Sequence, residues 1–149
     1  MKRPLIRGVA IFLIGVIVGG VIFSSSQRRS LLTVPTCEEC LSPAAFLGLV
    51  GSVVVLKTPG LIPNNVYETD RMLAFAHPKP SYPKHFVFVP KKDIKAIGDL
   101  AVGDERYVAE LLDAMGTVIR EQKMTEYTIW SNGPGMQTVE YLHYHVGGK

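Results

Sequence analysis

Two histidines near the C-terminus, His143 and His145, are the residues best suited to chemistry. The stretch 137–146 predicts a strand, and strand side chains alternate between faces, so Tyr141, His143 and His145 would share one face. Imidazoles titrate near neutral pH and can act as nucleophiles or hold a metal ion. A metal would need a third ligand on that face, and the strand does not supply one. The spacing leaves two interpretations open: a reactive histidine pair, or a solvated His-x-His face.

The elements that would position these histidines form an α+β domain over residues 41–149. The segment 104–123 has apolar residues every three or four positions, which predicts one long amphipathic helix. Short helices are expected at 43–50 and 94–100. Strands are expected at 52–57, 66–68, 72–76, 85–90, 127–130 and 137–146. Antiparallel strands beside one main helix are typical of the α+β class.

The first 29 residues differ in composition from this domain. No charged residue occurs from Gly8 to Phe23, and a helix over residues 5–26 would rise about 33 Å, enough for a bilayer core of roughly 30 Å. We therefore expect a single-pass transmembrane anchor at 1–29, with a cleaved signal segment as the alternative. Three basic residues precede the span and two follow it, which favours a domain on the extracytoplasmic side. Residues 30–40 would be a linker.

The charge of the chain gives no indication of nucleic acid binding. The formal net charge is +3, and removing Lys2, Arg3 and Arg7 brings it to zero. A body with balanced charge does not predict nucleic acid binding.

Several motifs together resemble the histidine triad (HIT) superfamily of nucleotide hydrolases and transferases. The resemblance extends from about residue 62 to residue 149. In chain order, the matching segments are VYETDRMLAF at 66–75, HFVFVPKK at 85–92, Asn132-Gly133, QTV at 137–139, and LHYHVGGK at 142–149.

The resemblance implies a nucleotide whose α-phosphate lies against the histidines. His143 would be the nucleophile that forms a nucleotidyl-histidine, and His145 would donate to the phosphoryl oxygens. His85 would support them. The implied nucleotide contacts are Asn132, Gln137 and Thr138 near the phosphate and ribose, and Leu73 and Phe75 around the base. The implied reaction cleaves P–N or P–O–P bonds of nucleoside phosphoramidates or dinucleotides, in a homodimer.

Two positions depart from the family pattern. Tyr141 replaces the first histidine of the triad, and a phenol with a pKa of about 10 carries no positive charge at neutral pH. His77 replaces an acidic residue that contacts the ribose hydroxyls. These departures favour an alternative, a nucleotide-binding module with little turnover. A metal-binding protein that uses His143 and His145 is a third hypothesis.

Cys37 and Cys40 form a C-x-x-C pair ahead of the domain. In relatives such a pair joins histidines in a structural zinc site, but here Asp93 occupies a frequent histidine position. Two cysteines alone make half a zinc site. The alternatives are zinc or a free or oxidised pair, and no other cofactor is expected.

Overall fold

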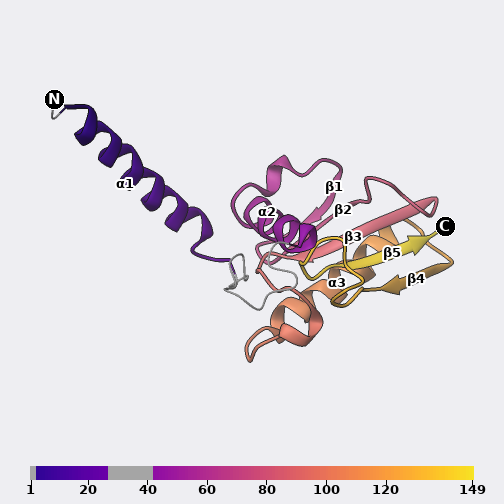
Figure 1. Ribbon diagram of the computed structural model, residues 1–149. Helices are drawn as coiled ribbons and strands as arrows, with labels where there is room; N and C mark the ends of the chain where they lie inside the picture. Colours follow the sequence, from indigo (N-terminus) through magenta and orange to yellow (C-terminus); the bar gives the residue numbers. More distant parts are fainter. Residues whose placement is uncertain (1–2, 27–41) are drawn as a thin grey trace.

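The computed structural model describes residues 3–26 and 42–149. Its core is a five-stranded antiparallel sheet with strand order β1-β2-β3-β5-β4 (Figure 1). The elements are α1 (Arg3–Phe23), α2 (Pro43–Lys57), β1 (Asn65–Glu68), β2 (Met72–Ala76), β3 (Lys84–Pro90), α3 (Glu105–Glu121), β4 (Tyr127–Trp130) and β5 (Tyr144–Gly148). The predicted α+β class and the antiparallel sheet of about five strands are confirmed.

Helix α3 covers one face of the sheet. It buries Leu111, Ala114, Met115 and Val118, which recur at the three- and four-residue spacing of a helix face. They pack on alternate strand residues, among them Phe86 and Phe88 of β3 and Met72 and Ala74 of β2. The long amphipathic helix predicted at 104–123 is confirmed, and it closes this face with an apolar core.

Helix α2 lies on the opposite face and runs unbroken to Lys57, so the predicted strand at 52–57 is wrong. Ser42 caps its first turn by accepting a hydrogen bond from the Ala45 amide at 3.1 Å, and Pro43 begins the helix. The β-branched run Val53–Val55 favours a strand by propensity. Packing decides otherwise, because Val55 is buried against residues of the sheet.

Residues 137–143 do not continue the last strand. β5 begins at Tyr144, so the expectation that Tyr141, His143 and His145 share one strand face is wrong. Tyr141 and Leu142 are neighbours and both are buried, and the Leu142 amide donates to the Ile94 carbonyl at 2.6 Å. Tertiary contacts therefore bend this segment away from the sheet. The expected short helix at 94–100 is only a single turn of 3-10 helix at Ile97–Asp99.

Helix α1 extends away from the rest of the molecule (Figure 1). The membrane localisation predicted for the chain is contradicted, because none of the helices described within 3–26 and 42–149 has the length and apolar character that a bilayer crossing requires. The predicted transmembrane anchor and its extracytoplasmic orientation are therefore wrong. The expected linker at 30–40, with Cys37 and Cys40, lies outside the described residues.

Candidate functional site

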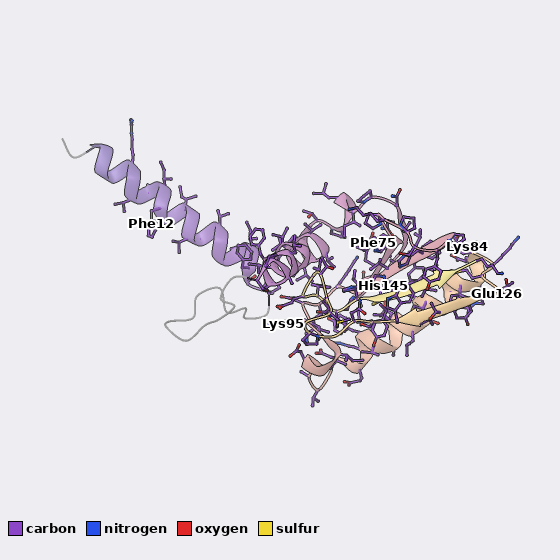
Figure 2. The ribbon with its side chains drawn as sticks, turned by 45° about the vertical axis from the view of Figure 1, so that its right-hand side comes forward. Phe12, Phe75, Lys84, Lys95, Glu126 and His145 are labelled. Carbon is purple, nitrogen blue, oxygen red and sulfur yellow. The ribbon has the colours of Figure 1, made fainter. Side chains whose placement is uncertain are left out.

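The face of the sheet opposite α3 has one row of side chains that crosses four strands. Phe75 of β2 pairs with Val87 of β3, Val87 pairs with His145 of β5, and His145 pairs with Trp130 of β4. Figure 2 labels two members of this row, Phe75 and His145, in the region beside α2. Because paired residues of neighbouring strands point to the same side, this row forms the floor of the site.

A cavity of about 680 Å³ lies between this row and α2. One group of lining residues is apolar, comprising Val54, Val55, Ile62, Phe75, Val87, Val89 and Val139. The other is polar or basic, comprising His77, Lys79, Asn132, Thr138, His143 and His145. None of the described residues that line the cavity is acidic. An apolar cleft with a few convergent polar groups is the usual form of a small-molecule site.

The backbone fixes the tautomer of His143. Its Nδ1 lies 2.6 Å from the carbonyl oxygen of Tyr141. A carbonyl oxygen only accepts, so Nδ1 carries the proton and Nε2 keeps its lone pair. The Ser131 hydroxyl donates to the carbonyl of His143 at 2.7 Å and so holds its backbone. His143 therefore has an unprotonated Nε2 when its ring is neutral, and it is one of the residues that line the cavity.

His145 has the opposite tautomer. The Ser81 amide donates to Nδ1 of His85 at 3.2 Å, so the proton of His85 is on Nε2. That nitrogen lies 3.1 Å from Nδ1 of His145 and donates to it. The proton of His145 is then on Nε2, which makes this nitrogen a hydrogen-bond donor. Two neighbouring histidines thus have different roles, one with a lone pair and one with an N–H group.

Burial favours the neutral forms of His145 and His85. Desolvation lowers the pKa of His145 to about 4, with further lowering by the nearby His143, His85 and His77. Desolvation also lowers the pKa of His85, with His77 adding to the effect. The ring of Trp130 stacks on the ring of His145, with centroids 4.9 Å apart. His145 is therefore a neutral donor at physiological pH.

His77 joins this cluster from the loop after β2. Its ring is parallel to that of His85, with centroids 4.2 Å apart. The Lys79 amide donates to Nδ1 of His77 at 3.0 Å, so the proton is on Nε2. All four histidines of the chain therefore lie in one cluster.

The distances within this cluster suit a metal ion, but its hydrogen bonds do not. His77, His85 and His145 each offer a nitrogen, and these atoms lie within 4.8 Å of one another. A metal ligand must present a lone pair. In His77 and His85 the lone pair already accepts a backbone amide, and in His145 it accepts the proton of His85. Zinc at this cluster would have to replace those hydrogen bonds.

Not every residue expected in the site reaches the cavity. Phe75, Asn132 and Thr138 line it. Leu73 is buried in the core beneath it, with Val87 and Val89. The side-chain amide of Gln137 donates to the Asn132 carbonyl at 2.7 Å and braces the loop.

Tyr141 lines the cavity but is almost fully buried, and its hydroxyl donates to the Pro90 carbonyl. The phenol therefore ties the bent segment 137–143 to the end of β3.

The cavity is also lined by Trp130, Lys79 and the helical residues Val54 and Val55, which no sequence pattern indicated as site residues. Trp130 ends a predicted strand immediately before the Asn132 turn. This position is the only sequence feature that could have indicated it as a site residue. Lys79 lies in a loop where no periodic pattern applies. The two valines belong to the segment 52–57, whose β-branched run predicts a strand.

Comparisons with known proteins identify the family of the chain. The HIT domain family matches residues 62–149. An uncharacterized HIT-like protein of Synechococcus elongatus is 30% identical over 105 residues, covering 68% of this chain and 90% of the relative. A protein of Brassica juncea named 14 kDa zinc-binding protein is 29% identical over 108 residues, covering 68% and 92%.

Solved structures share the fold. A HIT family hydrolase of Legionella pneumophila superposes with a TM-score of 0.58 at 29% identity, covering 63% of this chain and 88% of that one. A histidine triad protein of Clostridium difficile superposes with a TM-score of 0.59 at 28% identity, covering 67% and 89%. The family match covers more than half of the chain, and the chain belongs to the HIT domain family.

Proposed function

We propose that this protein is a nucleotide hydrolase or nucleotidyl transferase that uses His143 as its nucleophile. Its substrates would be nucleoside phosphoramidates or dinucleotides with a P–N or P–O–P bond. The observation that carries the proposal is the hydrogen bond from Nδ1 of His143 to the Tyr141 carbonyl. That bond leaves the Nε2 lone pair available in a cavity with both apolar and donor groups.

The proposed reaction has two steps. In the first, Nε2 of His143 forms a bond to the α-phosphorus, and the P–N or P–O bond to the leaving group breaks. The leaving group takes the electron pair and receives a proton from water. The ring becomes cationic, and the Tyr141 carbonyl stabilises that charge through Nδ1–H. In the second, a water oxygen attacks phosphorus, the bond to Nε2 breaks, and the water gives up a proton.

His145 would donate its Nε2–H to a phosphoryl oxygen in both steps. Because its pKa is low, His145 is neutral and donates a hydrogen bond without transferring its proton. Such a donor suits a phosphoryl oxygen whose negative charge increases during the reaction. His85 would be a positioning residue that fixes the tautomer of His145. Asn132 and Thr138 would contact the phosphate and ribose, and Phe75 would contact the base.

Turnover by the full chain tests this proposal. We would incubate adenosine and guanosine 5′-phosphoramidates with the wild type and with His143→Asn, and measure the monophosphate that is released. The proposal expects the variant to lose at least about a thousandfold in kcat, because the nucleophile is absent. The matched control is Lys123→Glu, an exposed change beyond α3 that does not line the cavity. Wild-type turnover that survives in His143→Asn would contradict the proposal.

A second candidate is a nucleotide-binding module with slow turnover. The burial of Tyr141 and its hydrogen bond to Pro90 favour it, because the phenol is engaged with the backbone. No turnover in the wild type, together with a rise in Tm when AMP or GMP is added, would support the binding module.

The homodimer and the zinc site at Cys37 and Cys40 stay predictions, although one relative is named a zinc-binding protein.

A further inference from the structure

The indole of Trp130 contacts both histidines of the hydrogen-bonded pair in the candidate site. It is nearly parallel to the ring of His145, at an interplanar angle of 11°, and its centroid lies 5.3 Å from that of His85. The centroids of His85 and His145 are 5.2 Å apart, and Nε2–H of His85 donates to Nδ1 of His145. Both imidazoles are buried. The indole therefore lies beside the hydrogen bond that fixes the tautomer of His145.

Strand pairing and a glycine place the indole there. Trp130 of β4 pairs with His145 of β5, so the two side chains point to the same side of the sheet. The next residue of β5 on this side is Gly147, where a Cβ would lie 2.4 Å from Cδ2 of Tyr82 and 3.0 Å from Cη2 of Trp130. A side chain at position 147 would displace Tyr82 and crowd the indole. Tyr82 in turn packs against Trp130, with ring centroids 5.8 Å apart. These contacts fix the indole beside the histidines.

The proton of His145 needs such surroundings to stay on one nitrogen. A neutral imidazole carries its proton on Nδ1 or on Nε2, and its hydrogen-bond partners decide which. Water can donate or accept at either nitrogen, so water at His145 would leave both tautomers populated. A ring that excludes water strengthens the hydrogen bond from His85, because such a bond is stronger in surroundings of low dielectric constant.

We propose that Trp130 is a positioning residue, which excludes water from the His85–His145 hydrogen bond and so keeps the proton of His145 on Nε2 for the phosphoryl group. It acts through His145 and not by contact with the leaving group, because its ring already contacts His85, His145 and Tyr82. The catalytic consequence rests on the proposed function. The structural consequence, a single tautomer of His145, does not.

NMR of the full chain with isotope-labelled histidine tests the structural consequence without any turnover. At about pH 8, the wild type should show His145 protonated on Nε2 and a ring N–H signal of His85 that exchanges slowly with water. Signals that are missing in His145→Gln and His85→Gln assign the two rings. In Trp130→Leu the His85 signal should exchange at least about tenfold faster, and His145 should show both tautomers.

Two variants of the same strand are the controls. Trp130→Phe keeps a flat apolar ring and should retain the single tautomer. Tyr127→Leu also changes an aromatic residue to leucine, but three residues earlier in β4 and therefore on its other face, and it should leave both signals unchanged. If Trp130→Leu fails to fold, judged by its thermal melt, Tyr82→Leu loosens the indole and should also speed the exchange.

Turnover tests the catalytic consequence. Trp130→Leu should lower kcat for adenosine 5′-phosphoramidate about tenfold, because His145 loses its single tautomer and its fixed orientation. The Kd for AMP should stay within about twofold of wild type. The same loss in kcat should apply to an adenosine phosphoramidate whose leaving group is an arylalkylamine. Trp130→Phe should recover most of the lost kcat.

The outcomes separate this inference from the proposed function. Slow exchange and a single His145 tautomer in folded Trp130→Leu would overturn the positioning role, whatever the turnover. A much larger kcat loss with the arylalkylamine substrate would also overturn it, because the indole would then contact the leaving group. The expected NMR changes in a protein without wild-type turnover would sustain the positioning role and remove the proposed reaction.

Discussion

The two faces of the sheet are built from the same strands but have different tasks. On the α3 face, Phe86 and Phe88 of β3 pack into a closed apolar core. On the α2 face, Val87 of β3 lines a cavity of about 680 Å³, and His85 contacts His145, which also lines it. Because strand residues alternate, a change at one position affects one face only. The comparison indicates that the α3 face is a closed apolar core, whereas the α2 face combines a smaller buried cluster with the candidate site.

The covering helices explain why only one face is closed. α3 has an amphipathic pattern, and its apolar stripe fits the sheet. α2 is apolar on all sides and approaches the bent segment before β5 at Gly48, where a Cβ would lie 2.4 Å from the Glu140 carbonyl oxygen. The Glu140 amide donates to the Ala44 carbonyl at 3.1 Å, which fixes this contact. α2 therefore contacts that segment and leaves a cavity above the strands.

The largest expected effect separates stability from activity. Met115 of α3 is buried in the core of the closed face. Met115→Ala should lower the free energy of unfolding by about 2–5 kcal/mol through lost burial and a new cavity. Turnover per folded molecule should stay within about twofold of wild type, because the site is on the other face. Chemical denaturation and phosphoramidate kinetics give the two values.

The control for that change is Leu112→Ala, three residues earlier on the same helix. Leu112 is 57% exposed, so its truncation should change stability by less than about 0.5 kcal/mol. A large loss of activity in Met115→Ala, at full folding, would show that the two faces are not independent.

The next effect is the loss of stability at acid pH that His145, on the α2 face of the sheet, should cause. His145 has a folded-state pKa of about 4 against an ordinary value of 6.5. The unfolded chain binds more protons between these values, so stability is fully present above about pH 6.5 and falls as the pH drops toward 4. The loss from His145 alone is on the order of 3 kcal/mol.

Other groups also titrate in acid, so the test compares the stability loss of the wild type with that of a variant that lacks His145. Denaturation midpoints at about pH 7 and pH 4.5 would be measured for the wild type and His145→Gln. The wild type should lose more stability than the variant over this interval. Equal losses would show that His145 is not held neutral by burial.

The smallest effect tests the contact that keeps the cavity open. Gly48→Ala should cost about 1–3 kcal/mol, because the added Cβ meets the Glu140 backbone. It should also weaken AMP binding, since α2 must move over the cavity. Gly60→Ala is the matched control, as no described atom lies within 4 Å of its added Cβ. Thermal unfolding with and without AMP measures both effects, and equal shifts in the two variants would contradict the contact.

Sequence patterns predicted the closed face well and the open face only in part. The spacing of Leu111, Met115 and Val118 indicated α3, and the alternation in 85–90 indicated β3. These patterns are local. The strand assigned to 52–57 was wrong because burial of Val55 outweighs β propensity.

The site depends on contacts between distant residues that spacing does not contain. The four histidines were visible in the sequence, but their tautomers depend on the backbone groups of Ser81, Lys79 and Tyr141. The bend that separates Tyr141 from β5 arises from its packing against β3 and from the Leu142 amide. A strand rule based on alternation could not predict either feature.

The tautomers themselves can be measured directly. Nitrogen NMR of the full chain with isotope-labelled histidine, at about pH 8 where imidazoles are neutral, distinguishes Nδ1–H from Nε2–H. Signals missing in His143→Asn would assign that residue. We predict that His143 alone carries its proton on Nδ1, and that His77, His85 and His145 carry theirs on Nε2. A proton on Nε2 of His143 would leave it without the nucleophilic lone pair and would contradict the proposed function.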